Sequence, residues 1–76
     1  MLKQPELGKI IRFHRKKAAL SQSQLARLIG VGKSAIYDLE KGKETVQLDT
    51  LNKVLSGLNI SVQINSHLMN EYYAQS

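Results

Sequence analysis

The stretch SQSQLARLIGVGKSAIYDLEKG, Ser21–Gly42, decides the fold of this 76-residue chain. Ser21 and Gln24 have the spacing of a capping box, in which each side chain satisfies the backbone N–H of the other residue. Apolar residues then recur at helical spacing until Gly30, which can end a helix because glycine tolerates the left-handed conformation. The pattern predicts a short helix followed by a tight turn.

A second short helix is predicted directly after this turn, over KSAIYDLE. Gly32 is acceptable at its N-cap, and Lys41 and Gly42 end it. Its apolar residues face inward, whereas four others point outward: Lys33, Ser34, Tyr37 and Asp38. Two short helices joined by a glycine-containing turn are typical of the helix-turn-helix motif, whose second helix enters the major groove of DNA.

The same stretch resembles the Cro and phage-repressor (Xre-type) family. The matching features are Ser21-Gln22, Leu25-Ala26, Gly30-Val31, Ile36, Leu39-Glu40 and Gly42. The likeness extends back through Ile11–Lys16 and forward through Leu48–Leu58, so it covers most of the chain. It implies a lambda-repressor-like, mostly α fold that binds double-stranded DNA.

Charge is unevenly distributed along the chain. Residues 1–43 hold ten Lys or Arg residues against three Asp or Glu, whereas residues 44–76 hold one against three. A solvated basic surface alone would explain this excess, but the excess falls in the half that carries the helix pair. Together they favour a polyanion-binding face.

Composition excludes several other classes of protein. The chain has no cysteine and two histidines, so it offers neither a disulfide nor a zinc–thiolate site. Its carboxylates are scattered, which leaves no plausible pairing of nucleophile and base. We therefore expect no enzyme activity, no metal and no cofactor. The N-terminus lacks the apolar core of a signal peptide and no run could span a membrane, so a soluble, cytoplasmic protein is expected.

The first helix is expected from about Glu6 to Ala19, after a loose arm over residues 1–5. Its apolar stripe is Leu7, Ile10, Ile11 and His14. A packed neutral role is favoured for His14 over a metal or catalytic one, because no second ligand stands at suitable spacing. Ala19 occupies a turn position where the family often has Gly.

The resemblance also implies roles for particular residues. Arg15 and Glu40 match positions that form an internal ion pair in the family. Arg15 could instead contact a phosphate, but the pair is favoured because a partly buried Glu40 needs a partner. Base contacts are expected from Lys33, Ser34, Tyr37 and Asp38, and phosphate contacts from Gln22, Lys41 and Lys43.

A further helix is predicted from about Leu48 to Leu58, with leucines 48, 51, 55 and 58 on one stripe. Gly57 in its last turn indicates close packing. Asn59 can end this helix, since Asn is the commonest alternative to Gly at a left-handed C′ position.

Residues 60–65 alternate apolar and polar side chains, which predicts a β-strand with Ile60, Val62 and Ile64 on one face. A lone strand leaves unpaired backbone groups and needs a partner strand. The phrase VLSGLNISVQI is similar to the C-terminal part of the HipB-type antitoxins. That likeness implies strands paired between two subunits, an obligate homodimer and a HipA-like kinase toxin as a possible partner.

The expected architecture is thus about four helices plus a C-terminal strand that pairs across a dimer. Residues 1–66 form the DNA-binding domain with its dimerisation strand, and residues 67–76 form a tail, either a short amphipathic turn or a frayed terminus. The expected function is a sequence-specific regulator that represses its own toxin–antitoxin operon at a palindromic operator. The alternative is a toxin-neutralising interaction module for which DNA binding is secondary.

Overall fold

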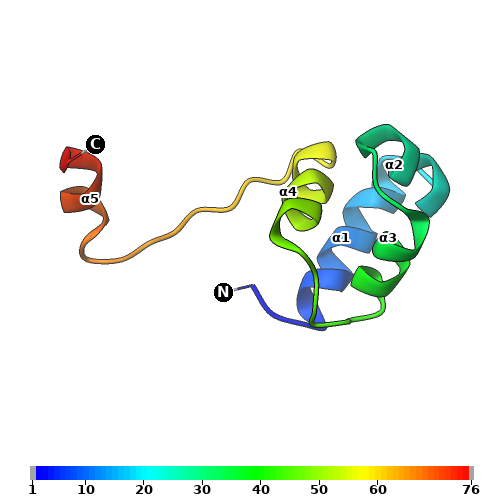
Figure 1. The fold of residues 1–76 in the computed structure, drawn as a ribbon, viewed down its shortest axis with the longest axis horizontal. Helices are drawn as coiled ribbons and strands as arrows, with labels where there is room; N and C mark the ends of the chain where they lie inside the picture. Colours follow the sequence, from blue (N-terminus) through cyan, green and yellow to red (C-terminus); the bar gives the residue numbers. More distant parts are fainter. Residues whose placement is uncertain (1, 76) are drawn as a thin grey trace.

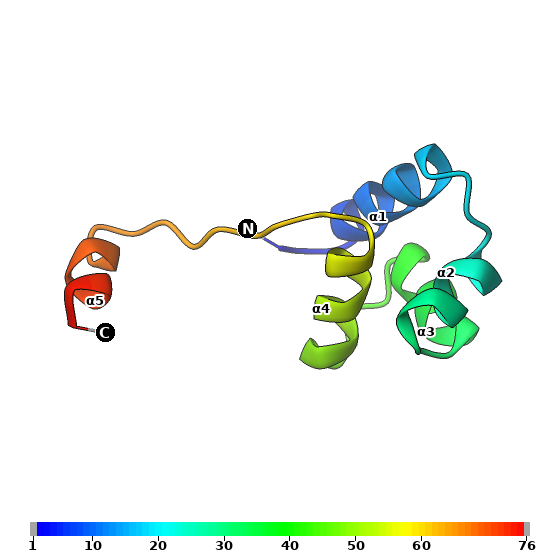
Figure 2. The same ribbon diagram turned by 90° about the horizontal axis from the view of Figure 1, so that it is seen from above.

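The computed structural model describes residues 2–75, which contain five α-helices and no β-strand. Four helices pack into one body and the fifth lies apart from it (Figures 1 and 2). The helices are α1 Glu6–Lys17, α2 Gln22–Ile29, α3 Lys33–Glu40, α4 Leu48–Gly57 and α5 Met69–Gln75. The first four helices are as predicted to within two residues, whereas the predicted fold also had a C-terminal strand and no fifth helix.

The core is built entirely from aliphatic side chains of α1 to α4 and the residue after α4. Its members are Leu7, Ile11, Leu25, Ala26, Ile36, Leu39, Leu51, Val54, Leu55 and Leu58. Three members of the predicted stripes do not belong to it, because Ile10 is 40% exposed, Leu48 is 71% exposed and His14 is only half-buried. Val54, which the predicted leucine stripe left out, is fully buried.

Close packing fixes how the helices cross. Gly57 lies against α2, where an added Cβ would meet Ile29 Cγ2 at 2.4 Å. Gly8 lies against the end of α3, where an added Cβ would meet the Leu39 carbonyl oxygen at 2.3 Å. A larger residue at either position would force the two helices apart.

Among residues 2–75, two residues other than glycine adopt the left-handed conformation, both of them at helix ends. Asn59 after α4 has φ 59°, as predicted for its role as the stop of that helix. Ala19 after α1 also has φ 59°, so the turn keeps the geometry that the family supports with Gly. Alanine pays a steric cost there, since its Cβ crowds the backbone.

The segment after α4 differs from the prediction. Ile60 is tied to the body by its N–H, which donates to the Leu55 carbonyl oxygen at 2.8 Å. Residues 61–66 then continue as an extended arm that carries α5 away from the body (Figures 1 and 2). Within one chain the expected strand is not formed, because no other segment of residues 2–75 offers it a strand edge. The tail holds a helix, which makes five helices instead of about four.

The strained turn at Ala19 predicts the effect of a substitution. Ala19→Gly should raise the free energy of unfolding by about 0.5–1 kcal/mol, because glycine removes the Cβ clash at positive φ. Ala18→Gly is the matched control, since Ala18 has φ −80° and gains nothing from glycine. Urea unfolding of both variants measures the difference, and equal destabilisation by the two would contradict this account of the turn.

Candidate nucleic-acid interface

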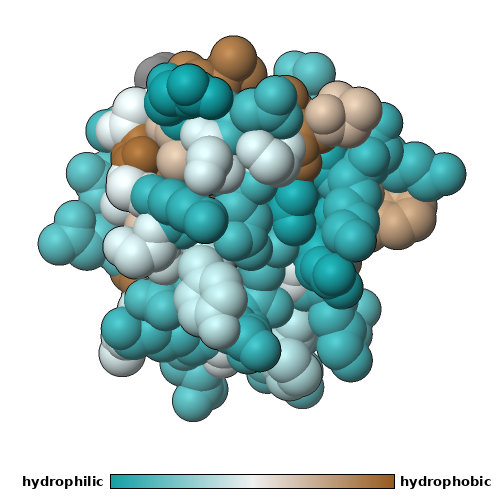
Figure 3. Space-filling view, turned by 90° about the vertical axis from the view of Figure 1, so that its right-hand side faces the viewer, coloured by the Kyte–Doolittle hydropathy of each residue, from teal (hydrophilic) through white to brown (hydrophobic). Residues whose placement is uncertain are grey.

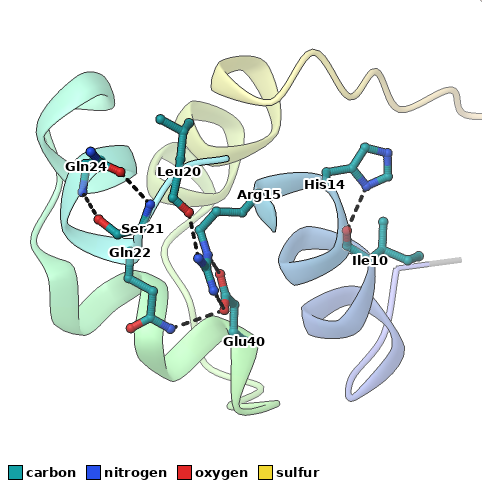
Figure 4. Close-up of polar contacts among 8 residues, drawn as sticks. All are labelled: Ile10, His14, Arg15, Leu20, Ser21, Gln22, Gln24 and Glu40. Carbon is teal, nitrogen blue, oxygen red and sulfur yellow. Dashed lines mark hydrogen bonds and ion pairs between the residues drawn. The ribbon is translucent and has the colours of Figure 1, made fainter. Parts of the chain in front are cut away.

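The helix pair α2–α3 has the local geometry that its sequence predicts. The Ser21 hydroxyl accepts from the Gln24 N–H at 3.0 Å, and the Gln24 side-chain oxygen accepts from the Ser21 N–H at 2.8 Å (Figure 4). Gly30 has φ 75° and its N–H donates to the Ala26 carbonyl oxygen at 2.9 Å, which closes the helix. Gly32 then turns the chain into α3 in an extended conformation.

The outward face of α3 carries the residues expected to read bases. Ile36 and Leu39 are buried on the opposite side of the helix, which leaves Lys33, Ser34 and Tyr37 exposed and Asp38 half-buried. The side of the molecule that carries α2 and α3 is mostly hydrophilic (Figure 3). The helix thus offers polar groups to the outside from a rigid, packed base.

Two contacts order side chains at the end of α3. The Lys41 ammonium lies 5.6 Å from the centroid of the Tyr37 ring, a cation–π contact one turn apart. The Lys43 ammonium lies 3.6 Å from a carboxylate oxygen of Asp38, and both side chains are about half exposed. Exposed pairs of this kind contribute little to stability, so Lys43 can exchange Asp38 for another anion at small cost.

A buried ion pair joins α1 to the last residue of α3. Arg15 donates from Nε to Glu40 Oε2 at 2.6 Å and from a terminal nitrogen to Glu40 Oε1 at 2.8 Å (Figure 4). Its other terminal nitrogen donates to the Leu20 carbonyl oxygen at 2.8 Å. The two side chains are only 9% and 4% exposed. This geometry places Arg15 inside the domain, away from the surface that a phosphate contact requires.

The same carboxylate also holds Gln22. The side-chain amide of Gln22, in the first turn of α2, donates to Glu40 Oε1 at 3.2 Å. Gln22 was expected at a phosphate, and it lies half-buried in the first turn of α2. Arg15, Gln22 and Glu40 therefore form one network that spans α1, α2 and α3.

The network sets the charge state of its members. Burial alone would raise the pKa of the Glu40 carboxyl, but hydrogen bonds from Arg15 and Gln22, with the charges of Arg15 and Arg12, outweigh burial and lower it. The hydrogen bond to Glu40 raises the pKa of the Arg15 guanidinium. Both groups are thus charged at neutral pH.

Gln4 has a structural role that was not predicted, since it lies in the segment expected to be a loose arm. Its side-chain nitrogen donates to the carbonyl oxygens of Leu39 and Lys43 at 2.9 and 3.1 Å. Its side-chain oxygen accepts from the Gly8 N–H at 2.8 Å. Gln4 therefore ties the start of α1 to the end of α3 and the loop after it. A glycine at position 8, inside the predicted first helix, is the sequence signal that could have indicated this close contact.

The remaining predictions concern the role of His14, a metal site and a membrane-spanning segment. His14 Nδ1 lies 2.7 Å from the Ile10 carbonyl oxygen, one turn back on α1, and its ring is half-buried (Figure 4). Within residues 2–75, no three His, Asp or Glu side chains gather in a way that could hold a metal ion. No helix in that part of the chain is long and apolar enough to cross a membrane.

The lowered pKa of Glu40 predicts how stability depends on pH. A carboxyl whose pKa is lower in the folded state stabilises the fold above its unfolded pKa of about 4.3, and this contribution is lost as pH falls through the folded value. Glu40→Gln should therefore unfold more easily at pH 7 and lose less stability on acidification than the wild type. The control Glu44→Gln removes the same charge from an exposed position. Thermal melts from pH 7 to pH 2 measure all three proteins, and parallel pH profiles for Glu40→Gln and the wild type would contradict the assignment.

Comparison with known proteins agrees with this geometry. The profile of the family described as "Helix-turn-helix", HTH_3, matches residues 11–65. The uncharacterised HTH-type transcriptional regulator y4mF of Sinorhizobium fredii is 41% identical over 59 residues, which cover 78% of each chain. Among solved structures, chains of the HipB–O4 20mer complex and of the HipA–HipB–O2–O3 complex each superpose with a TM-score of 0.77 at 24% identity. Each match covers 88% of this chain and 94% of the other, and shows a shared fold. The matched profile spans most of the chain, which therefore belongs to the helix-turn-helix family of DNA-binding transcriptional regulators, a family of regulators and not of enzymes.

Proposed function

We propose that this protein is a sequence-specific repressor that binds a palindromic operator as a homodimer, in the cytoplasm. The observation that carries the proposal is the outward face of α3, where polar side chains project from a helix that the Arg15–Glu40–Gln22 network holds in place. A recognition helix needs such rigidity, because base contacts depend on side chains being aimed within fractions of an ångström.

Base reading falls to the four residues on the outward face of α3. Lys33 suits the acceptor edge of guanine, and Ser34 can donate to or accept from any base. Tyr37 presents a ring and a hydroxyl, and Asp38 can accept from the amino group of cytosine. Asp38 also forms the exposed ion pair with Lys43. DNA binding would break this pair, and Lys43 would then contact a phosphate.

Phosphate contacts fall to residues at the edges of the helix pair. Lys41 and Lys43 lie at and beyond the end of α3, and Gln22 lies at the start of α2. The first turn of α2 adds backbone N–H groups and the positive end of the helix dipole, which favour a phosphate oxygen. These contacts would fix the register of the protein on DNA and carry no sequence information.

This division of labour is tested by two lysine variants. Lys33→Ala should weaken specific binding by about 1–3 kcal/mol and relax the preference at one base pair. Lys43→Ala should weaken binding to all sequences alike and reduce the slope of affinity against salt concentration. Fluorescence anisotropy on specific and random duplexes at several salt concentrations measures both. Identical effects of the two variants would refute the assignment.

The arm after α4 supports a homodimer. Val62 is 50% exposed and Ile64 is 72% exposed, so their apolar side chains remain in water in the single chain. Within residues 2–75, none of the backbone N–H groups of residues 61–65 donates a hydrogen bond to another backbone group. Antiparallel pairing with a second copy would satisfy every second one of these groups, and Ile60, Val62 and Ile64 would then cover the ends of both α4 helices. It would set the two recognition helices about 34 Å apart, one turn of DNA.

Proline scanning tests the pairing without knowledge of its register. In an antiparallel ladder, neighbouring residues point their N–H groups to opposite sides, so either Val62 or Gln63 donates to the partner strand. One of Val62→Pro and Gln63→Pro should therefore give monomers, and the other should keep the dimer. Val62→Ala is the control that retains the N–H. Sedimentation at micromolar concentration decides the matter, and a wild-type monomer or two dimeric proline variants would overturn the proposal.

We infer further that the repressor is of the HipB antitoxin type and regulates its own operon. The shared fold with HipB chains supports this, as does the HipA–HipB–O2–O3 complex, in which such a chain is assembled with HipA. The alternative is a toxin-neutralising module for which DNA binding is secondary, and the exposed apolar residues of the arm favour a protein contact. Titration against a duplex from its own promoter and against the product of the neighbouring gene separates the two functions.

A further inference from the structure

The one phenylalanine of the chain lies on the surface and not in the core. Phe13 is 59% exposed on α1, whereas the core is filled by aliphatic side chains. The Lys17 ammonium lies 5.7 Å from the centroid of its ring, and the His14 ring meets it edge-on at 5.6 Å. A large apolar ring thus lies largely in water, in contact with a lysine and a histidine of its own helix.

Four cations surround this ring. Lys9, Arg12, Lys16 and Lys17 line a surface hollow of about 380 Å³ together with Phe13, and we name these five residues the α1 outer face. The two ion pairs found in residues 2–75 are Arg15–Glu40 and Lys43–Asp38, so none of the four cations is neutralised by an ion pair there. Glu6 is the one carboxylate of α1, and it lies in the first turn, before these cations.

The α1 outer face points away from the helix that reads DNA. The residues that α1 buries against α3 include Leu7, Ile11 and Arg15. Phe13, Lys9 and Lys16 lie on the other side of α1, since residues at 100° steps place them opposite this buried stripe. Figure 2 shows α1 at one edge of the body with α3 and α4 beneath it. A duplex against α3 therefore leaves the α1 outer face free.

We infer that the α1 outer face is a docking site for an acidic, amphipathic helix of a partner protein. Carboxylates of the partner would pair with the cations, and an aliphatic or aromatic side chain would cover the Phe13 ring. A duplex backbone would match the charge, but it presents phosphates and sugar edges and no apolar side chain that could cover the ring. The inference does not depend on the antitoxin role, and it predicts that partner and DNA bind at the same time.

The test uses the full chain and a fluorescein-labelled helical peptide whose one face carries glutamates around leucines. A peptide of the same composition with its leucines scattered around the helix is the matched control. The first peptide should bind more tightly, shift amide NMR signals of residues 9–17, and remain bound when random-sequence duplex DNA is added at low salt. Phe13→Ala should weaken the affinity for the first peptide by about fivefold or more, and Lys16→Glu by about tenfold. Lys53→Glu on α4 should change this affinity by less than about twofold.

Three results would overturn the inference. Equal binding of both peptides, or no effect of Phe13→Ala, would mean that the face attracts any polyanion by charge alone. Displacement of the peptide by the duplex, with shifts confined to residues 33–43, would mean that the peptide occupies the DNA-binding face. Shifts of residues 9–17 caused by the duplex itself would assign the face to DNA.

Discussion

The buried ion pair between Arg15 and Glu40 is the constraint on which the rest of the domain depends. It is bidentate, it is nearly excluded from water, and it links the middle of α1 to the end of α3. The pair fixes the relative positions of α1 and α3 more than it adds to the net stability of the domain. The attraction between two buried charges offsets the cost of removing them from water only when all of their hydrogen bonds are made. Here they are made: Gln22 and the Leu20 carbonyl complete the set, and no buried side-chain polar atom within residues 2–75 lacks a partner.

Different surfaces around this ion pair have different proposed functions. The outward side of α3 is left polar and accessible, while Gln4 and Gly8 hold its carboxyl end against α1. The arm of residues 61–66 carries apolar side chains that do not pack against the core of the single chain and remain exposed. A domain of this size often completes its core by association, and the proposed dimer would serve stability and DNA spacing with the same strand.

The sequence predicted the local structure best where a residue type strongly favours one backbone conformation or one hydrogen bond. The capping box at Ser21 and Gln24, the left-handed Gly30 and the stop at Asn59 are all as predicted, because each depends on backbone geometry within a few residues. The α4 stripe was less well predicted, since periodicity could not tell which of Leu48 and Val54 faces the core. Gln4 was missed because the two carbonyl oxygens to which it donates lie more than 30 residues away, at Leu39 and Lys43. The strand at residues 60–65 needs a second chain, so its pairing stays a prediction, as do the base and phosphate contacts.

The most direct test of the account is the stability of Arg15→Ala without DNA. The substitution strands the buried carboxylate of Glu40, so the free energy of unfolding should fall by about 1–3 kcal/mol. Lys16→Ala, an exposed cation one residue further along the same helix, should change it by less than about 0.5 kcal/mol at equal protein concentration. Thermal and urea unfolding of both variants give these values. If Arg15→Ala melts like the wild type but loses affinity for DNA, Arg15 is a phosphate contact and the ion pair does not hold the domain together.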